Sequence, residues 1–145
     1  MTDTRTAPYA ALLLRLSLGV MFLAHGLLKI MVFTPAGTAG FFASLGLPAW
    51  LAYPTMAAEV LGGLLLIAGV QTRFVALVLL PILVGSLWVH SGNGWLFTNE
   101  NGGWEYPLFL SMAAAAQALL GDGAYSLNDL FGRTKPSYTQ HVSSA

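Results

Sequence analysis

A few ionisable side chains stand alone inside otherwise apolar stretches of this 145-residue chain. His25 and Lys29 lie one helical turn apart, Glu59 sits in the next apolar run, and His90 ends a third. Imidazole, ammonium and carboxylate groups can donate, accept and carry protons. Such groups must be paired, protonated or hydrated in an apolar setting, because an isolated buried charge is costly. Their placement predicts a site for proton or hydrogen-bond chemistry.

The composition indicates a protein that faces lipid. Hydrophobic residues make up 56% of the chain and charged residues only 8%, whereas soluble domains carry about a quarter charged residues. The net charge is zero, so nothing in the sequence predicts a nucleic-acid partner. The chain has no cysteine, which excludes disulfides, thiol redox chemistry and cysteine-ligated metal clusters. Any electron transfer would therefore need a bound organic cofactor or haem.

Four apolar runs are long enough, or nearly so, to cross a bilayer, because about 20 helical residues span the hydrocarbon core. They cover residues 9–32, 51–70, 74–90 and 104–120. The predicted fold is an all-α polytopic membrane protein, a four-transmembrane-helix bundle that forms one domain over residues 1–130. We expect the first run to remain as an uncleaved span, and residues 131–145 to form a disordered cytoplasmic tail.

The connections between the runs predict how they are arranged. The tight turn at residues 71–73 makes the second and third runs an antiparallel hairpin. Segment 34–50 is uncharged, with glycine and proline at both ends and an apolar centre. It predicts a short interfacial or re-entrant helix near residues 40–45. The basic residues outside the runs all fall on one side of this arrangement, so the positive-inside rule places both termini in the cytoplasm.

If the first two runs are helices, the ionisable residues and the glycines of each run fall on one face of that helix. The stripe on the first run contains Arg15, Gly19, Gly26 and Lys29, with His25 beside it. On the second run, Glu59 shares a face with Thr55, Gly62 and Gly63. Ionisable groups within a membrane face the protein interior, and small residues let a neighbouring backbone approach. These two faces are therefore expected to pack together.

Depth along the helices predicts a site in the outer half of the bundle. Counted from the outer helix ends, His25 lies about 10 Å deep and Glu59 about 12 Å deep. We expect Glu59 to be the central, proton-carrying residue, with His25 and Lys29 as its nearest partners. The expected ligand contacts are His90, Glu105 and Trp88. No metal site is predicted.

Arg15 is the exception, because it lies in the cytoplasmic third of the first run. A buried arginine needs a partner, and Asp122 or Asp129 follows the fourth run on the same side. The sequence therefore predicts a structural ion pair between Arg15 and Asp122.

Several motifs, taken in order, resemble the DoxX family of small bacterial membrane proteins. They are Arg15, HGLLK at 25–29, SLGLP at 44–48, AAEVLGGLLLIAGVQTR at 57–73, His90, GGWEYPLFL at 102–110 and GDGAYSLNDL at 121–130. The resemblance covers residues 15–130 and implies a four-helix protein of the bacterial inner (cytoplasmic) membrane. Relatives are associated with quinone-linked oxidoreductase systems, thiosulfate:quinone oxidoreductase among them, and with membrane complexes that defend against oxidants.

Three classes of function are consistent with these features. The first is a membrane subunit of a quinone-linked oxidoreductase, which would hold quinone or a similar small apolar ligand in an apolar slot with hydrogen-bonding groups at its oxygens. Trp88 or Trp95 would flank the ring, and a haem ligated by His25 and His90 is an alternative cofactor. The second is a non-catalytic anchor or assembly partner of an oxidant-defence complex. The third is a small-solute transporter, which would need a homo-oligomer to supply an inverted repeat.

Overall fold

The structure, a computed structural model, describes residues 5–130, and every regular element in that range is helical. The helices are α1 (Ala7–Met31), α2 (Pro35–Ser44), α3 (Ala52–Ala68), α4 (Thr72–His90), α5 (Glu105–Leu120) and α6 (Leu127–Leu130). Two short 3-10 helices, η1 (Ala49–Leu51) and η2 (Ser91–Asn93), precede α3 and follow α4. The predicted all-α class is confirmed. The predicted tail, residues 131–145, lies outside the described residues.

Three helical segments of the described chain are long and apolar enough to cross a membrane. They are Ala7–Met31, Ala49–Ala68 and Thr72–Asn93. They agree closely with the predicted runs at 9–32, 51–70 and 74–90. The fourth run matches α5, but that helix has only 16 residues, fewer than the about 20 that cross a hydrocarbon core.

Local sequence signals explain where the helices begin and end. Pro35 opens α2, where its missing N–H costs nothing, and the Thr34 hydroxyl caps that helix by accepting the Gly37 N–H at 3.2 Å. Helix α3 ends at Gly69, whose φ of +72° is a left-handed conformation that glycine adopts freely. The chain then turns at once into α4, as the turn at residues 71–73 predicted.

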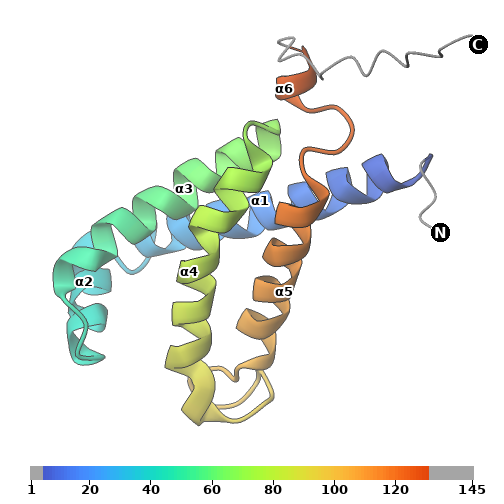
Figure 1. The fold of residues 1–145 in the computed structure, drawn as a ribbon. Helices are drawn as coiled ribbons and strands as arrows, with labels where there is room; N and C mark the ends of the chain where they lie inside the picture. The colour runs from blue at the N-terminus through green and yellow to red at the C-terminus, as the bar shows by residue number, and fades with distance from the viewer. Residues whose placement is uncertain (1–4, 131–145) are drawn as a thin grey trace, which may run out of the picture.

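The helices form two pairs (Figure 1). Helix α1 packs along α3, and α4 packs along α5. In the view of Figure 1 the pairs meet near the α3–α4 turn and separate toward α2 and the loop at 91–104. A hydrophobic core fills the junction of the pairs; its buried members are Leu18, Phe22, Leu66, Val75, Leu79, Leu83 and Ala114.

A second, smaller cluster attaches α2 to the start of α3. Its buried members are Ala39, Ala52 and Met56, and Phe42 packs against them. The Thr38 hydroxyl also donates to the Lys29 carbonyl oxygen at 3.1 Å, which ties α2 to the end of α1. Helix α2 is therefore held beside the opening between the helix pairs and forms one of its walls.

Glycines bring the backbones of α1 and α3 into contact, as the striped pattern predicted. A Cβ atom added at Gly63 would lie 2.6 Å from the Leu23 nitrogen and 2.8 Å from the Gly19 carbonyl oxygen. One added at Gly26 would lie 3.1 Å from the Glu59 Cβ. Only residues without a side chain permit this approach, which places Glu59 against α1.

Replacing Gly63 with alanine should therefore destabilise the protein, although alanine is the better helix former. The methyl group meets backbone atoms that cannot rotate away, so α1 and α3 must separate, at a cost of about 1–3 kcal/mol. Gly40→Ala in α2 is the matched control, because an added Cβ there meets nothing within 4 Å. Thermal unfolding in detergent measures both. Equal melting temperatures for the two variants would contradict the close packing.

At the end of the helix pairs opposite the opening, Arg15 holds the segment that follows α5. Its guanidinium is 1% exposed and donates to the backbone carbonyl oxygens of Asp122, Ala124 and Tyr125 at 2.9, 3.4 and 3.3 Å. The Asp122 carboxylate instead accepts the Thr72 N–H at 3.1 Å and the Asn128 side-chain N–H at 3.0 Å.

The predicted ion pair between Arg15 and Asp122 thus takes a different form. Arg15 binds the backbone of the segment, and the Asp122 carboxylate caps the N-terminus of α4, where the helix dipole favours a negative charge. The Thr72 N–H and the Asn128 side-chain N–H occupy the carboxylate oxygens, and the guanidinium binds three backbone carbonyl oxygens of segment 122–125.

The Asp122 carboxylate should make stability depend on pH. Burial raises its pKa, but the hydrogen bonds from Asn128 and Thr72 and the charge of Arg15 lower it more, so the pKa lies below the ordinary 3.8. The stabilisation is therefore complete above pH 3.8 and is lost as the pH falls through the lowered pKa. We expect the melting temperatures of the native protein and Asp122→Asn to differ at pH 7 and to converge in acid. Glu100→Gln, at an exposed loop position, should show no such convergence.

Candidate functional site

A cavity of about 1110 Å³ occupies the opening between the helix pairs. Its walls come from α1, α2, α3, α4, α5 and the loop at 91–104. Most of its lining is apolar, and its aromatic residues are Phe22, Phe33, Phe41, Phe42, Trp88, Phe97 and Tyr106. Pockets for small ligands usually measure about 300–1,000 Å³. This one therefore has room for an aromatic ring together with an apolar substituent.

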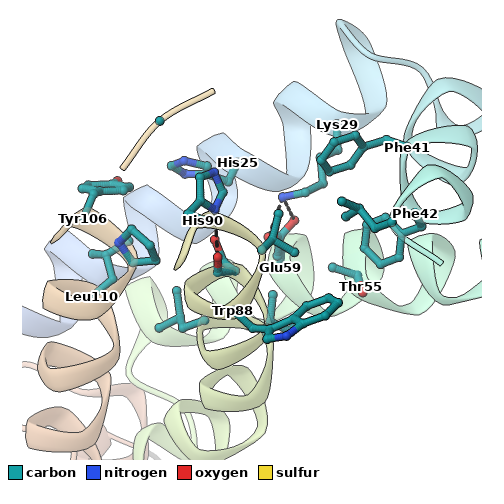
Figure 2. A pocket seen from close by; sticks show the side chains of 18 of the residues that line it. His25, Lys29, Phe41, Phe42, Thr55, Glu59, Trp88, His90, Tyr106 and Leu110 are labelled. Atoms are coloured by element: carbon teal, nitrogen blue, oxygen red, sulfur yellow. Dashed lines mark hydrogen bonds and ion pairs between the residues drawn. The ribbon is translucent and has the colours of Figure 1, made fainter. Parts of the chain in front are cut away.

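An ion pair lies in the wall of the cavity. The Lys29 Nζ atom is 2.7 Å from Glu59 Oε1 and 2.8 Å from Oε2. The Glu59 side chain is 5% exposed and that of Lys29 22% exposed, so the carboxylate depends on the lysine for its counter-charge. Figure 2 shows the pair between the imidazoles and the aromatic residues of α2. The lysine of the first apolar run thus faces the carboxylate of the second, across the glycine contact.

Two histidines from different helices line the same cavity. Each donates from Nδ1 to the carbonyl oxygen one turn earlier: His25 to Met21 and His90 to Ser86, both at 2.8 Å. A carbonyl oxygen can only accept, so Nδ1 carries a proton in both rings. When such a ring is neutral, its Nε2 is the unprotonated nitrogen. The backbone of α1 and α4 therefore fixes the tautomer of both histidines.

Tyr106 and the phenylalanines of α2 belong to the cavity but were not predicted from the sequence. The Tyr106 ring stacks on His25 with centroids 6.1 Å apart and planes 29° from parallel. Phe41 and Phe42 bring aromatic surface from α2 toward the Glu59 carboxylate (Figure 2). The sequence signals for them were the apolar centre of segment 34–50 for Phe41 and Phe42 and the GGWEYPLFL motif at 102–110 for Tyr106.

The structure gathers most, but not all, of the predicted residues. His25, Lys29, Glu59, Trp88 and His90 all line the cavity. Glu105 does not: its Oε1 accepts the Phe97 N–H at 2.9 Å, and it lines a neighbouring cavity of about 490 Å³ together with Trp95. Side chains in the first turn of a helix lean back toward its N-terminus, which directs Glu105 at the loop. The expected contact of Glu105 with the ligand stays a prediction, because Glu105 lines the neighbouring cavity and not this one.

Arg15 and Asp122 lie apart from the cavity, beyond the hydrophobic core. Within residues 5–130, no group of three or more histidine, aspartate or glutamate residues is placed to hold a metal ion. The Lys29–Glu59 ion pair and the two histidines are thus the acid–base groups of the cavity considered for proton chemistry.

Comparison with known proteins finds a match over the part of the chain that contains His25, Lys29, Glu59 and His90. The model of the DoxX family matches residues 10–92, which include most of α1 and all of α2, α3 and α4. A Bacillus subtilis (strain 168) protein named "Putative oxidoreductase CatD" is 41% identical over 76 residues, which are 52% of this chain and 55% of that protein. The match thus spans about half the length of the relative. No solved structure matches. The chain belongs to the DoxX family.

Proposed function

We propose that this protein is the integral membrane subunit of a quinone-linked oxidoreductase system and binds a quinone, or a similar small apolar ligand, in the cavity. The observation that carries the proposal is the cavity itself, apolar and aromatic over most of its surface, with two histidines and one ion pair in its wall. A quinone requires this combination, because its ring is apolar and its two oxygens form hydrogen bonds. The name of the Bacillus relative, an oxidoreductase, supports the same class of function.

In this proposal the residues have separate tasks. His25 and His90 form hydrogen bonds with the ligand oxygens and exchange protons with them. Glu59 is the carboxylate through which protons reach the site, and Lys29 is its partner in the ion pair. Trp88 and the phenylalanines of α2 form the apolar surface on which a ring or its substituent lies.

Binding can be tested with the purified protein in lipid nanodiscs. A short-tailed benzoquinone should bind the native protein, and Glu59→Gln should weaken its binding at unchanged protein folding; His90→Phe should weaken the binding of the corresponding hydroquinone. Leu119→Ala is the control, since that side chain is 79% exposed and far along α5 from the cavity. An absorption spectrum of the same sample tests the haem alternative, because a Soret band would show that the protein binds haem. Failure of both the benzoquinone and its hydroquinone to bind at any concentration would refute the proposal.

We further propose that α5 is the fourth membrane span, that α2 lies at the interface, and that both termini face the cytoplasm of a bacterial inner membrane. The pairing of α5 with α4 supports a span, and the location of Arg73 beside the end of α5 supports the orientation. Because the chain lacks cysteine, Ser91→Cys should react with an impermeant thiol reagent in intact cells, and Ser137→Cys should react only after lysis. Labelling of position 137 in intact cells would reverse the orientation.

The anchor or assembly role is a second candidate, and the close Lys29–Glu59 contact favours it. If the pair only joins α1 to α3, its removal should lower stability, and any oxidant resistance that the protein provides should fall only in proportion.

A further inference from the structure

We infer that the cavity selects the reduced, hydroxyl-bearing form of its ligand, a hydroquinone, over the oxidised quinone. This inference rests on the proposed function and specifies its ligand. A quinone oxygen can only accept a hydrogen bond, whereas a hydroquinone hydroxyl can donate one. The preference is therefore decided by whether the cavity presents acceptors or donors.

The two histidines present acceptors. Their Nδ1–H groups are committed to the carbonyl oxygens of Met21 and Ser86, at 2.8 Å each, so the neutral rings offer an Nε2 lone pair. The Nε2 atom of His90 lies beside Gly102, where an added Cβ would be only 3.6 Å away. The missing side chain of Gly102 leaves room in front of this nitrogen. Figure 2 shows both imidazoles between Tyr106 and the ion pair.

The donors of the cavity are largely occupied. The Lys29 ammonium group is shared between both oxygens of Glu59, the Thr55 hydroxyl donates to the Leu51 carbonyl at 2.8 Å, and the Tyr106 hydroxyl donates to the Met21 sulfur at 3.6 Å. The Ser86 hydroxyl can donate or accept, so it does not discriminate. The Trp88 indole lies at the Phe42 end of the cavity, away from the imidazoles (Figure 2).

Histidine acceptors also suit the removal of protons from a hydroquinone. When an O–H bond of the ligand donates to a neutral Nε2, that nitrogen can also accept the hydroxyl proton, leaving the ligand oxygen as a phenolate. The cavity is accordingly shaped to bind a ligand that donates hydrogen bonds.

The test compares three ligands that share one ring and one decyl tail: the benzoquinone, its hydroquinone and the dimethyl ether of the hydroquinone. Their affinities for the native protein in nanodiscs are measured without oxygen at pH 8.5, where imidazole is ordinarily neutral. We expect the hydroquinone to bind about tenfold more tightly than the quinone, since a well-placed hydrogen bond is worth about that factor. The ether, which has no donor, should bind no better than the quinone.

Substitution of each histidine separates hydrogen bonding from shape. His90→Phe and His25→Phe keep an aromatic ring but remove Nε2, so the ratio of hydroquinone to quinone affinity should fall toward one, with melting temperatures near that of the native protein. Equal affinities in the native protein, or tighter quinone binding, would overturn the inference and leave the proposed function intact. Failure of all three ligands to bind would reject the proposed function together with the inference.

Discussion

Replacing Lys29 with methionine is expected to lower the free energy of unfolding by about 3–5 kcal/mol, because it leaves a buried carboxylate without its counter-charge. The Glu59 side chain is only 5% exposed, and both of its oxygens are satisfied by Lys29. Methionine fills the space of the lysine stem but cannot neutralise the charge. The melting temperature in detergent should therefore fall well below that of the native protein.

The reverse substitution, Glu59→Gln, should cost less. It leaves the Lys29 ammonium without a carboxylate, but that side chain is 22% exposed and long enough to reach water or headgroups. The double variant Lys29→Met/Glu59→Leu should recover most of the stability lost by Lys29→Met, because an apolar pair of similar volume often replaces a buried ion pair without loss. If Lys29→Met alone melts like the native protein, Glu59 is not ionised in the folded state.

The same variants separate the two candidate functions. In the double variant the fold is restored but the titrating carboxylate is gone. Loss of quinone binding at normal stability would assign Glu59 to the site. Retention of binding would limit the pair to joining α1 and α3, as the anchor role requires. Lys29→Met by itself cannot decide this, since it changes stability and site together.

Arg15→Met is the second change with a large expected effect, a loss of about 3 kcal/mol or more. The substitution removes a charged donor from three backbone carbonyl oxygens, and hydrogen bonds to charged groups contribute about 1.5–3 kcal/mol each before losses from imperfect geometry. Two of the three contacts are long, at 3.3 and 3.4 Å, which keeps the expected total near that of one or two strong bonds. Arg15→Lys should be intermediate, because one ammonium group cannot reach all three oxygens.

Arg73→Met is the matched control. This exposed arginine makes a single 3.4 Å contact with the Ala118 carbonyl, so its loss should change stability by about 0.5 kcal/mol or less. Melting temperatures in detergent compare the three arginine variants. Limited proteolysis supplies a second measurement, since release of residues 121–126 in Arg15→Met should open a cleavage site there. Equal stability of Arg15→Met and Arg73→Met would contradict the role of Arg15 in holding this segment.

The sequence by itself determined the helices and the faces on which they meet. Apolar runs of the right length predicted α1, α3, α4 and α5, because about 20 consecutive apolar residues match the length of a membrane-spanning helix, whereas a spanning strand needs only about half as many. The position of Glu59 on a glycine-lined face predicted that it would meet a basic residue of the first helix. Glu59 is the one carboxylate within the second span, and the first span carries Arg15, His25 and Lys29, so a basic residue of the first span is the partner that satisfies both charges.

The tertiary structure decided which polar groups share a cavity and which do not. Glu105 begins α5 and His90 ends α4 on the same side of the fold. The Glu105 carboxylate nevertheless accepts the Phe97 N–H, and Glu105 does not line the cavity that contains His90. Arg15 and Asp122 lie near each other as predicted, yet the carboxylate caps α4 and the guanidinium binds carbonyl oxygens. In both cases the outcome depends on which backbone N–H and C=O groups lie close to the charged side chain. Because the backbone groups are the same along the chain, the sequence does not reveal which of them will bind.

The aromatic walls of the cavity also emerged only from the fold. Phe41, Phe42 and Tyr106 come from α2 and α5, and they face Glu59 and His25 because the two helix pairs separate at one end. Periodicity places a residue on one face of its own helix. Which neighbour that face meets depends on how the helices cross, and crossing is set by the summed packing of many side chains.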